Sequence, residues 1–255
     1  MPAISVIIIT KNEQHNIADC ISTAKLLSAD IVVADSGSTD DTIAIARAAS
    51  AQVIQVSWIN FGDARNHAAA AANNDWIFAL DADERITPSL ADSIRELSLN
   101  NPQKVYGCKR QSYFLGSKIS FGEWGKDKVY RLYNRNHVSW NAVPVHEELK
   151  GDDMQKELVN GHIDHYTVAS DEEYQEKTMK YARLSAEKYF KHHKQATIEK
   201  RFLSPAFTFL KSYILLLGFL DGEAGLRIAR ASAYATWLKY HYLHELNSGR
   251  QSSNS

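Results

Sequence analysis

The nine residues WIFALDADE, at positions 76–84, decide how this chain folds. The first five are apolar, and an apolar run of this length is typical of a β-strand that is buried on both faces. Two carboxylates, Asp81 and Asp83, follow with one small residue between them. Open parallel sheets place their ligands at the carboxyl ends of the strands, so the sequence predicts a binding site at this acidic pair.

Asp81 and Asp83 repel each other unless a positive group lies between them. A divalent cation satisfies this requirement, and hard carboxylate oxygens suit Mg²⁺ or Mn²⁺. The alternative is a polar loop with surface aspartates, which often follows a strand. This stretch leaves both interpretations open, and the rest of the chain favours the metal site.

The first hundred residues alternate between strand and helix patterns. Runs rich in β-branched residues predict strands, and apolar side chains at helical spacing predict the helices between them. Ser38 and Asp41 resemble a helix-capping pair, and Pro88 suits the first position of a further helix. Such elements with short connections predict a parallel sheet with right-handed crossovers. The predicted strands are residues 4–9, 31–34, 53–56 and 76–80, and the predicted helices begin at residues 17, 42, 61 and 88.

After residue 102 the pattern changes to strands that alternate aromatic and basic side chains, at 106–114 and 128–133. From residue 170 onward the pattern is helical. The sequence therefore predicts an α/β fold: a Rossmann-like, mixed and mostly parallel sheet flanked by helices, with a C-terminal helical extension.

Composition excludes several classes of protein. The formal net charge of −1 gives no signature of nucleic-acid binding. Charge is unevenly distributed, because residues 190–255 hold nine Lys and Arg against four Asp and Glu, a balance of +5. The two cysteines form no CxxC motif, which supports neither a disulfide framework nor a zinc site. The N-terminus lacks the basic and long apolar regions of a leader, so we expect a cytosolic protein.

Three polar clusters follow three of the predicted parallel strands, at residues 10–13, 35–40 and 81–83. The ends of neighbouring strands meet at one edge of a sheet, so the clusters are expected to share one crevice. Several acids around a metal suit a nucleotide diphosphate, because the metal neutralises the phosphates while other acids hydrogen-bond the base and the ribose. The three clusters together, in this order, are much stronger evidence than any one of them.

The segments SVIIITKNE (5–13), VADSGSTDDT (33–42) and ALDADE (79–84) resemble family 2 glycosyltransferases of the GT-A fold, and the resemblance runs over roughly residues 3–165. It implies an inverting transferase that uses a nucleotide-diphosphate sugar, expected here to be a UDP-sugar. It also implies that Asp81 and Asp83 form the DxD motif, whose carboxylates bind the metal and the ribose–diphosphate.

By the same resemblance, Thr10, Glu13 and Asp35 line the nucleoside pocket. Many members carry two acids where this chain has Asp35 and Ser36, which leaves open which residue meets the base. Four basic residues are candidates for phosphate contacts, although a solvated surface charge is the favoured interpretation of each: Lys11, Arg65, Lys128 and Arg131.

Residues 123–127, 145–147 and 218–225 resemble a subgroup, the bacterial lipopolysaccharide-core glucosyltransferases that modify heptose. This closer resemblance implies transfer of a hexose, expected to be glucose, to a heptose of a lipid-linked saccharide in the inner core. The expected domains are a GT-A catalytic domain at 1–168, with a nucleotide-sugar half to about residue 100 and an acceptor half after it, a helical region at 169–247 and a disordered tail at 248–255.

Inverting transfer is one in-line displacement with a transition state like that of glycosidases, and it needs a base and a stabilised leaving group. Glu147 is the expected base and Asp127 the second candidate, because a carboxylate must take the proton of the acceptor hydroxyl. His146 or His165 is expected as a third metal ligand. For His165, a structural histidine is an equally favoured interpretation.

The segment 202–220 is very apolar, but its longest uncharged run, 212–220, is shorter than the roughly 20 residues that span a bilayer. Scattered basic residues and nearby aromatic residues favour a helix that lies in the membrane interface, where anionic lipid attracts the positive balance. The alternative is a helix packed on the catalytic domain or in a dimer interface. With a lipid-linked acceptor, the expected location is the cytoplasmic face of the inner membrane.

Two other functions compete with sugar transfer. In an aspartyl phosphatase Asp81 would be the nucleophile of a DxDx[TV] motif, but Arg85 occupies the position that this motif gives to Thr or Val. A non-catalytic nucleotide-sugar sensor at the membrane would bind UDP with metal and show no turnover.

Overall fold

The computed structural model describes residues 3–125, 127–143, 147–168 and 171–252. The chain forms two compact units. The first comprises Met1–Arg110 and Asp127–His165, and the second comprises Gln111–Lys126 and Tyr166–Ser255. The sequence assigns residues 111–126 to the catalytic domain, whereas this division groups them with the C-terminal helices.

The first unit is built on four parallel strands in the order β3-β2-β1-β4. They are β3 (Gln52–Gln55), β2 (Ile31–Asp35), β1 (Ile4–Thr10) and β4 (Trp76–Asp81). Every residue of β1 and β2 is buried, as expected for β-branched runs in the middle of a sheet. The predicted strands of the first half are therefore confirmed.

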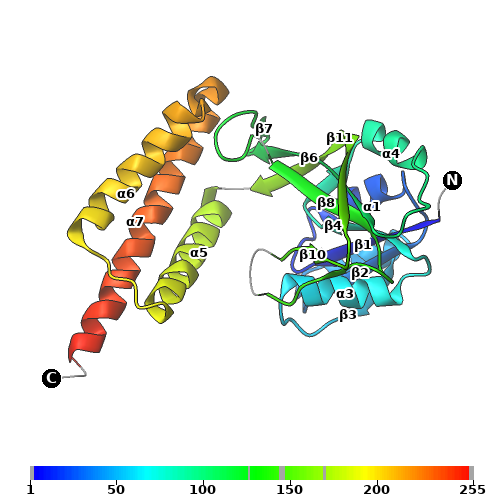
Figure 1. The fold of residues 1–255 in the computed structure, drawn as a ribbon, viewed down its shortest axis with the longest axis horizontal. Helices are drawn as coiled ribbons and strands as arrows, with labels where there is room; N and C mark the ends of the chain where they lie inside the picture. The colour runs from blue at the N-terminus through cyan, green and yellow to red at the C-terminus, as the bar shows by residue number, and fades with distance from the viewer. Residues whose placement is uncertain (1–2, 126, 144–146, 169–170, 253–255) are drawn as a thin grey trace. The chain divides into compact units, whose positions relative to one another are not determined.

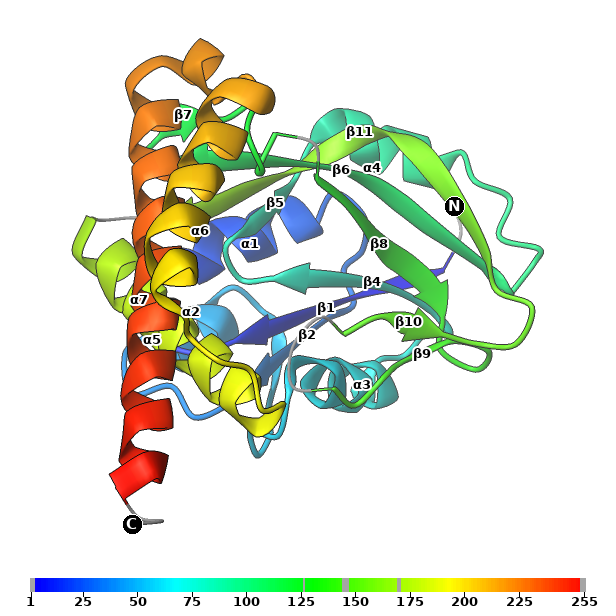
Figure 2. The same cartoon turned by 60° about the vertical axis from the view of Figure 1, so that its left-hand side comes forward.

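Helices cover both faces of these strands: α1 (Ile17–Ala24), α2 (Thr42–Ala48), α3 (Phe61–Ala71) and α4 (Pro88–Arg95). Successive side chains of a strand point to opposite faces, so one strand supplies two cores. Ile8 packs in the cluster that contains α1 and α4 residues, and Ile7 packs in the cluster that contains α3 residues. Figure 2 shows α3 below β1 and β2, with α1 on the other side of the strands.

Two helix starts have the side-chain caps that stabilise a first turn. The side chain of Asn60 accepts from the backbone N–H of Asp63 before α3, and that of Thr87 accepts from Leu90 before α4. The predicted Ser38–Asp41 cap is wrong. Asp41 precedes α2 without a side-chain cap, and the hydroxyl oxygen of Ser38 accepts instead from the backbone N–H of Asn12, at 2.8 Å.

The later strands continue the sheet from β4 in the order β8-β6-β11-β5, and a short strand β7 pairs with β6. Strand β8 is antiparallel to both β4 and β6. The three-residue strand β5 is not predicted from the sequence, because it is too short and too polar to show a pattern. The bounds are β5 (Glu84–Ile86), β6 (Lys104–Phe114), β7 (Ser117–Lys118), β8 (Asp127–Asn134) and β11 (Gln155–Val168), with β9 (Ser139–Trp140) and β10 (Leu149–Lys150) as a separate pair. The predicted α/β class with a mixed sheet is confirmed.

The second unit is mainly helical. Helices α5 (Asp171–Lys191) and α6 (Ile198–Leu210) both pack against the long helix α7 (Gly222–Ser252), and Figure 1 shows α6 and α7 side by side. A π-helical turn and a 3-10 turn join α6 to α7, at Lys211–Leu215 and Gly218–Asp221. Helix α7 continues to Ser252, past residue 248 where the sequence predicts a disordered tail.

Asp221 holds residues 111–126 to these helices, because its carboxylate accepts the backbone N–H groups of Ser120 and Phe121 at 3.0 and 2.8 Å. In the described part of the chain, no single helix is long and apolar enough to cross a membrane. One pair of helical segments, Ile198–Leu215 and Gly218–Gly249, reaches that length and apolarity together, with a bend of 71° between them.

Gly161 in β11 offers a test of packing in the first unit. Its φ is +93°, and a Cβ there would lie 2.5 Å from the backbone N and Cα of Leu90 in α4. Gly37 has the same φ of +93° but open space around it, so it is a matched control for backbone strain. We expect Gly161→Ala to lower the free energy of unfolding by about 1–3 kcal/mol more than Gly37→Ala does, because the packed Leu90 backbone must move. Equal losses in urea unfolding would contradict this packing.

Candidate active site

The three polar clusters lie together at one end of the parallel strands, as predicted. In the sheet, Thr10 of β1 is the register partner of Asp35 of β2, and Ile9 of β1 is the partner of Asp81 of β4. The loops after these three adjacent strands therefore form one edge of the first unit.

Asp35 shapes the loop that follows β2. Its fully buried carboxylate accepts the backbone N–H groups of Gly37 and Ser38, both at 2.9 Å, and the hydroxyl of Ser38. Asn12, whose φ is +56°, ties this loop to the loop after β1, because its N–H donates to Ser38 and its side chain accepts from Thr39, each at 2.8 Å. The two loops thus form one rigid rim.

Thr10 places an unpaired polar atom at this rim. Its hydroxyl oxygen is buried and has no hydrogen-bond partner within residues that the structure describes. The neighbouring Ser36 hydroxyl donates to the backbone carbonyl of Thr10 at 3.1 Å, and Glu13 accepts from Asn16 at 2.8 Å, while Lys11 is exposed. A buried hydroxyl without a partner costs stability, so this position suits a ligand that hydrogen-bonds it.

Two buried arginines hold Asp81. The Nη2 of Arg65, from α3, donates to one carboxylate oxygen at 2.6 Å, and the Nη2 of Arg131, from β8, donates to the other at 2.9 Å. Burial alone would raise the pKa of Asp81, but Arg131 and Arg65 outweigh it and hold that pKa well below its usual range. In this structure, guanidinium groups therefore supply the positive charge beside Asp81.

Glu84 completes this network, although nothing in the sequence pattern indicates a role for it. It is fully buried, and its carboxylate accepts from Arg131 at 2.8 Å, from Arg110 at 3.3 Å and from the backbone N–H of Asp81 at 3.0 Å. Burial lowers the pKa of Arg131, yet Asp81 and Glu84 raise it above the ordinary value. The only signal in the sequence was the alternation of basic residues in the two strands that supply Arg110 and Arg131.

The favoured interpretation of Arg65 and Arg131 as solvated surface charges is therefore wrong. Both are buried, because carboxylates at the end of a buried strand need charged partners. Lys11 and Lys128 are exposed, as that interpretation predicts.

Both candidate bases are paired with arginine. Arg65 donates through Nη1 to Glu147, and its guanidinium carbon lies 4.6 Å from the ring centroid of Trp140. Asp127 accepts from Nε of Arg110 at 2.8 Å. Arg65 thus links Glu147 directly to Asp81, whereas Asp127 reaches Asp81 only through Arg110, Glu84 and Arg131.

Contacts between Trp140 and α3 position the ion pair of Arg65 and Glu147. Asn66 in α3 exchanges two hydrogen bonds with the backbone of Trp140, at 2.8 and 3.0 Å. A Cβ at Gly62, also in α3, would lie 2.3 Å from the carbonyl oxygen of Asn141, so the helix approaches this segment closely. The chain that leads to Glu147 is therefore anchored on the helix that carries Arg65.

The predicted metal ligands are brought together only in part. His165 lies with its Nε2 3.3 Å from a carboxylate oxygen of Asp83. Burial lowers the pKa of His165, but the bond to Asp83 outweighs it and raises the pKa. The described residues contain no group of three or more His, Cys, Asp or Glu side chains that could hold a metal, and His146 lies outside them.

Asp83 and His165 offer a divalent cation one carboxylate and one imidazole, a sparse donor set, and in this structure the two groups pair with each other. Asp81 fits less well in this arrangement, since both its oxygens already accept from arginine. The full predicted set of Asp81, Asp83, His146 and His165 stays a prediction.

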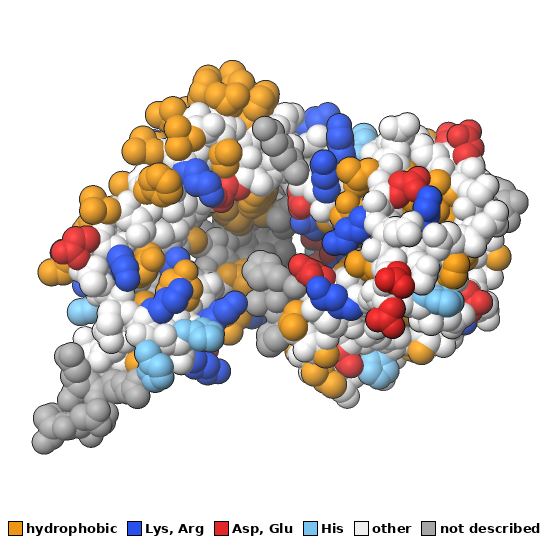
Figure 3. Space-filling model, in the orientation of Figure 1, with side chains coloured by type: hydrophobic (Ala, Val, Ile, Leu, Met, Phe, Trp, Pro, Cys, Tyr) orange, Lys and Arg blue, Asp and Glu red, His pale blue; other side chains and the backbone are white. Residues whose placement is uncertain are grey.

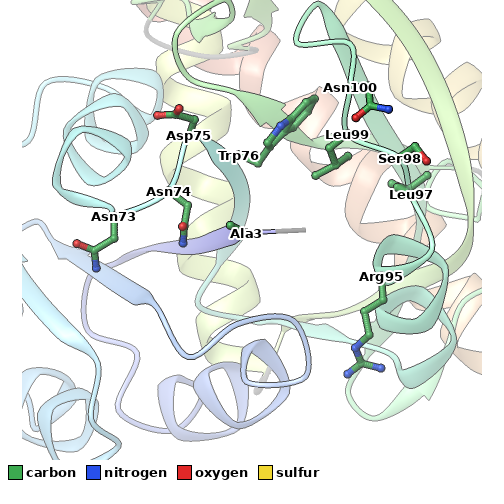
Figure 4. A pocket seen from close by; sticks show the side chains of 10 residues that line it. All are labelled: Ala3, Asn73, Asn74, Asp75, Trp76, Arg95, Leu97, Ser98, Leu99 and Asn100. Atoms are coloured by element: carbon green, nitrogen blue, oxygen red, sulfur yellow. The ribbon is translucent and has the colours of Figure 1, made fainter. Parts of the chain in front are cut away.

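A cavity of about 390 Å³ lies beside this network. Its lining includes Arg65, Asp81, Trp140 and Glu147. A larger cavity of about 620 Å³ lies at the opposite end of β4, where Trp76 begins the strand. Figure 4 shows its lining, with Asn73, Asn74 and Asp75 on one side and Leu97, Ser98, Leu99 and Asn100 on the other. The second cavity contains none of the predicted site residues, so the smaller one is the candidate active site.

The buried network predicts that Glu84→Gln destabilises the fold. The substitution removes the carboxylate charge from between Arg110 and Arg131, and breaking a buried ion pair costs about 3 kcal/mol or more. Glu157→Gln, which breaks the exposed pair with Lys104, is the control and is expected to cost less than about 1 kcal/mol. Urea unfolding of both variants measures the difference, and similar losses would show that the network contributes little.

Comparison with known proteins identifies the family. The sequence model of "Glycosyl transferase family 2" matches residues 5–147, more than half of the chain. An uncharacterized glycosyltransferase of Rickettsia typhi is 30% identical over 97% of this chain and 88% of its own length. The lipopolysaccharide core biosynthesis glycosyltransferase LpsC of Rhizobium meliloti is 24% identical over 95% of this chain and 93% of its own length.

Among solved structures, glucosyl-3-phosphoglycerate synthase from Mycobacterium tuberculosis, in complex with Mn²⁺, UDP and glucosyl-3-phosphoglycerate, matches with a TM-score of 0.35 and 25% identity over 44% of each chain. The matched family segment contains the ends of β1, β2 and β4 and the arginines that contact Asp81. It also contains Glu147. With its α/β sheet, this segment has the GT-A fold that the resemblance implied. The chain therefore belongs to glycosyl transferase family 2.

Proposed function

We propose that this family 2 glycosyltransferase is an inverting hexosyltransferase that moves glucose from a UDP-sugar to a heptose of the lipopolysaccharide inner core. One observation carries the proposal: Arg65 joins the first DxD carboxylate, Asp81, to the candidate base Glu147 within one cavity. A donor site and a proton acceptor are both needed for transfer, and here they share a buried residue.

The donor's nucleoside is proposed to lie at the rim formed by the loops after β1 and β2. The unpaired hydroxyl of Thr10 offers the nucleoside a hydrogen bond, Asp35 and Ser36 lie beside Thr10, and Glu13 follows in the loop after β1. Asp83 and His165 would hold a Mg²⁺ or Mn²⁺ ion. Such an ion, when bound, neutralises the charge of the departing diphosphate.

The reaction is one displacement at the anomeric carbon. The acceptor oxygen forms the new bond while the bond to the diphosphate oxygen breaks, and the hydroxyl proton passes to Glu147. The buried guanidiniums of Arg65 and Arg131 lie beside Asp81, where they would stabilise the charge that develops on the leaving diphosphate.

The acceptor assignment rests on two supports. The residues that resemble heptose-modifying transferases include Asp127 and Glu147, which lie in the catalytic unit. LpsC, a relative over nearly the whole chain, is described as a lipopolysaccharide core biosynthesis glycosyltransferase. The acceptor is therefore proposed to be lipid-linked, and the protein to act at the cytoplasmic face of the inner membrane.

The second unit offers a surface for that membrane. Helix α6 and the turns after it expose large apolar side chains, and in Figure 3 hydrophobic groups gather along the edge of the helical unit. These side chains are at least 44% exposed: Ile198, Phe202, Leu203, Phe207, Leu210, Ile214, Leu215, Leu217, Phe219 and Leu220. A contiguous apolar face of this kind is typical of a helix that lies in a membrane interface.

The phosphatase alternative loses support at the site. An aspartyl nucleophile needs a free carboxylate oxygen, whereas both oxygens of Asp81 accept from buried arginines. Arg85, at the position where that motif has Thr or Val, donates to the backbone carbonyls of Ala82 and Glu84 at 3.0 and 3.1 Å.

The proposed roles of Asp83 and Glu147 predict different losses. With UDP-[¹⁴C]glucose, Mn²⁺ and heptose-terminated lipopolysaccharide, we expect each of Asp83→Ala and Glu147→Gln to reduce transfer by about 100-fold or more. Calorimetric titration should show that Asp83→Ala also weakens Mn²⁺-dependent UDP binding, whereas Glu147→Gln preserves it. Asp92→Ala, at the surface of α4, is the control.

Full transfer by Asp83→Ala would refute the metal assignment. A wild-type protein that binds UDP with Mn²⁺ but transfers no glucose to this acceptor would favour the sensor or another acceptor.

The membrane proposal predicts that polar substitutions on α6 release the protein from lipid. Each large apolar side chain contributes about 1.5–3 kcal/mol when fully buried, so the triple variant Phe202→Gln, Leu203→Gln, Phe207→Gln should bind anionic vesicles at least tenfold more weakly. The control is Trp58→Gln with Ile59→Gln, which removes exposed apolar side chains from the first unit. Sedimentation with phosphatidylglycerol vesicles measures both, and unchanged binding of the triple variant would overturn the proposal.

A further inference from the structure

The cavity beside Glu147 contains more positive charge than the proposed chemistry uses. Three of its cations have partners: Arg65 pairs with Asp81 and Glu147, Arg131 with Asp81 and Glu84, and Arg110 with Glu84 and Asp127. Two further lysines, Lys128 and Lys156, line the same cavity. Within the described chain neither of them forms an ion pair. The three arginines and their four carboxylate partners carry a balance of −1, so the two lysines bring the group to +1.

One further acid of the lining has a partner of its own. Glu148 also lines the cavity, but its carboxylate accepts from Lys150 at 2.7 Å. That bond, with a smaller contribution from Lys156, lowers the pKa of Glu148. An anion in the cavity would therefore find Lys128 and Lys156 available.

Lys156 is held in place by an aromatic ring. Its ammonium nitrogen lies 5.0 Å from the ring centroid of Tyr130, a distance typical of a cation–π contact. The ring lies against the bare backbone of Gly107 in β6, since a Cβ there would be 2.7 Å from the ring carbon Cδ1. Because Gly107 has no side chain, the ring of Tyr130 can pack against its backbone. The ring in turn positions the ammonium group of Lys156.

Lys128 carries an unrelieved repulsion. It is the direct cross-strand partner of Lys109 in the antiparallel pair of β8 and β6. Directly opposed side chains share one face of a sheet, and like charges in this arrangement destabilise it. A bound anion would offset this repulsion, so the pair is better suited to a ligand than to bare solvent.

We infer that Lys128 and Lys156 bind an anionic substituent of the acceptor saccharide, a phosphate or a carboxylate, next to Glu147. This inference rests on the proposed function, because it concerns the acceptor of the transfer. The donor's diphosphate is assigned to the other side of the cavity, where Arg65 and Arg131 surround Asp81 at the end of β4. Lys128 of β8 and Lys156 of β11 lie in the half of the chain expected to receive the acceptor, and neither contacts Asp81.

Lysine suits this task. A lysine ammonium is a flexible point charge that meets phosphate or carboxylate without the fixed geometry of an arginine fork. Two such charges would select an anionic saccharide over a neutral one of the same shape, and would orient it so that one hydroxyl faces the base. The site is therefore a specificity determinant for charged acceptors.

The test uses small probes and the full-length protein saturated with UDP and Mn²⁺. Mannose 6-phosphate, glucuronate and mannose are titrated by calorimetry at low and high salt. We expect at least one anionic sugar to bind with an affinity that falls as salt rises, and neutral mannose to bind far more weakly. The sugar that binds more tightly, mannose 6-phosphate or glucuronate, indicates whether the acceptor group is a phosphate or a carboxylate.

The double variant Lys128→Gln, Lys156→Gln should weaken the anionic sugar about tenfold or more, and Lys128→Arg with Lys156→Arg should restore most of the affinity. The control Lys25→Gln with Lys118→Gln removes the same charge from two exposed lysines outside the cavity and should bind as the wild type does.

Equal binding by the wild type and the double variant, equal binding of mannose, or no binding of either anionic sugar would overturn the inference. So would competition between mannose 6-phosphate and UDP, because the lysines would then belong to the donor's diphosphate. UDP binding and glucose transfer to heptose-terminated lipopolysaccharide are measured in parallel. If UDP binding and glucose transfer both fail while the anionic sugar still binds in the absence of UDP, the proposed function is contradicted and the anion site is not.

Discussion

The structure of the first unit depends on two carboxylates, the partly buried Asp81 at the end of β4 and the fully buried Glu84 at the start of β5. Carboxylates taken out of water in this way need cations close to them to stay charged. The cations come from three different elements: Arg65 from α3, Arg110 from β6 and Arg131 from β8. The network therefore joins the parallel half of the sheet, whose loops after β1 and β2 form the rim, to the antiparallel half that supplies Arg110 and Arg131. The geometry of the candidate site and the stability of the fold depend on the same ion pairs.

The parallel half could be predicted from the sequence because its signals are local. The β-branched run of β1 and the apolar run of β4 each specify a buried strand, and their polar ends lie side by side once the strands pair. The second half depends on contacts between distant residues. Strand β5 exists because Glu84–Ile86 pairs with β11, about 80 residues later, and no local pattern announces that pairing.

The same distinction applies to the site. The DxD pair and the loop of Asp35 lie within motifs of a few residues, and the sequence placed them correctly at one sheet edge. It could not show that Arg65 reaches both Asp81 and Glu147, which are 16 and 82 residues away from it. The role of such a residue depends on its burial, which the sequence does not show. An arginine that is expected at the surface can instead be the buried partner that a carboxylate requires. The predicted Ser38 cap was wrong for a similar reason, since the hydroxyl oxygen of Ser38 accepts from Asn12, 26 residues earlier in the chain.

The position of Arg65 also makes two distant parts of the chain interdependent. One guanidinium contacts both Asp81 and Glu147, so a change at position 65 would disturb two carboxylates of the candidate site at once. In evolution, the segments that carry these two carboxylates are thereby constrained to change together around the same cation.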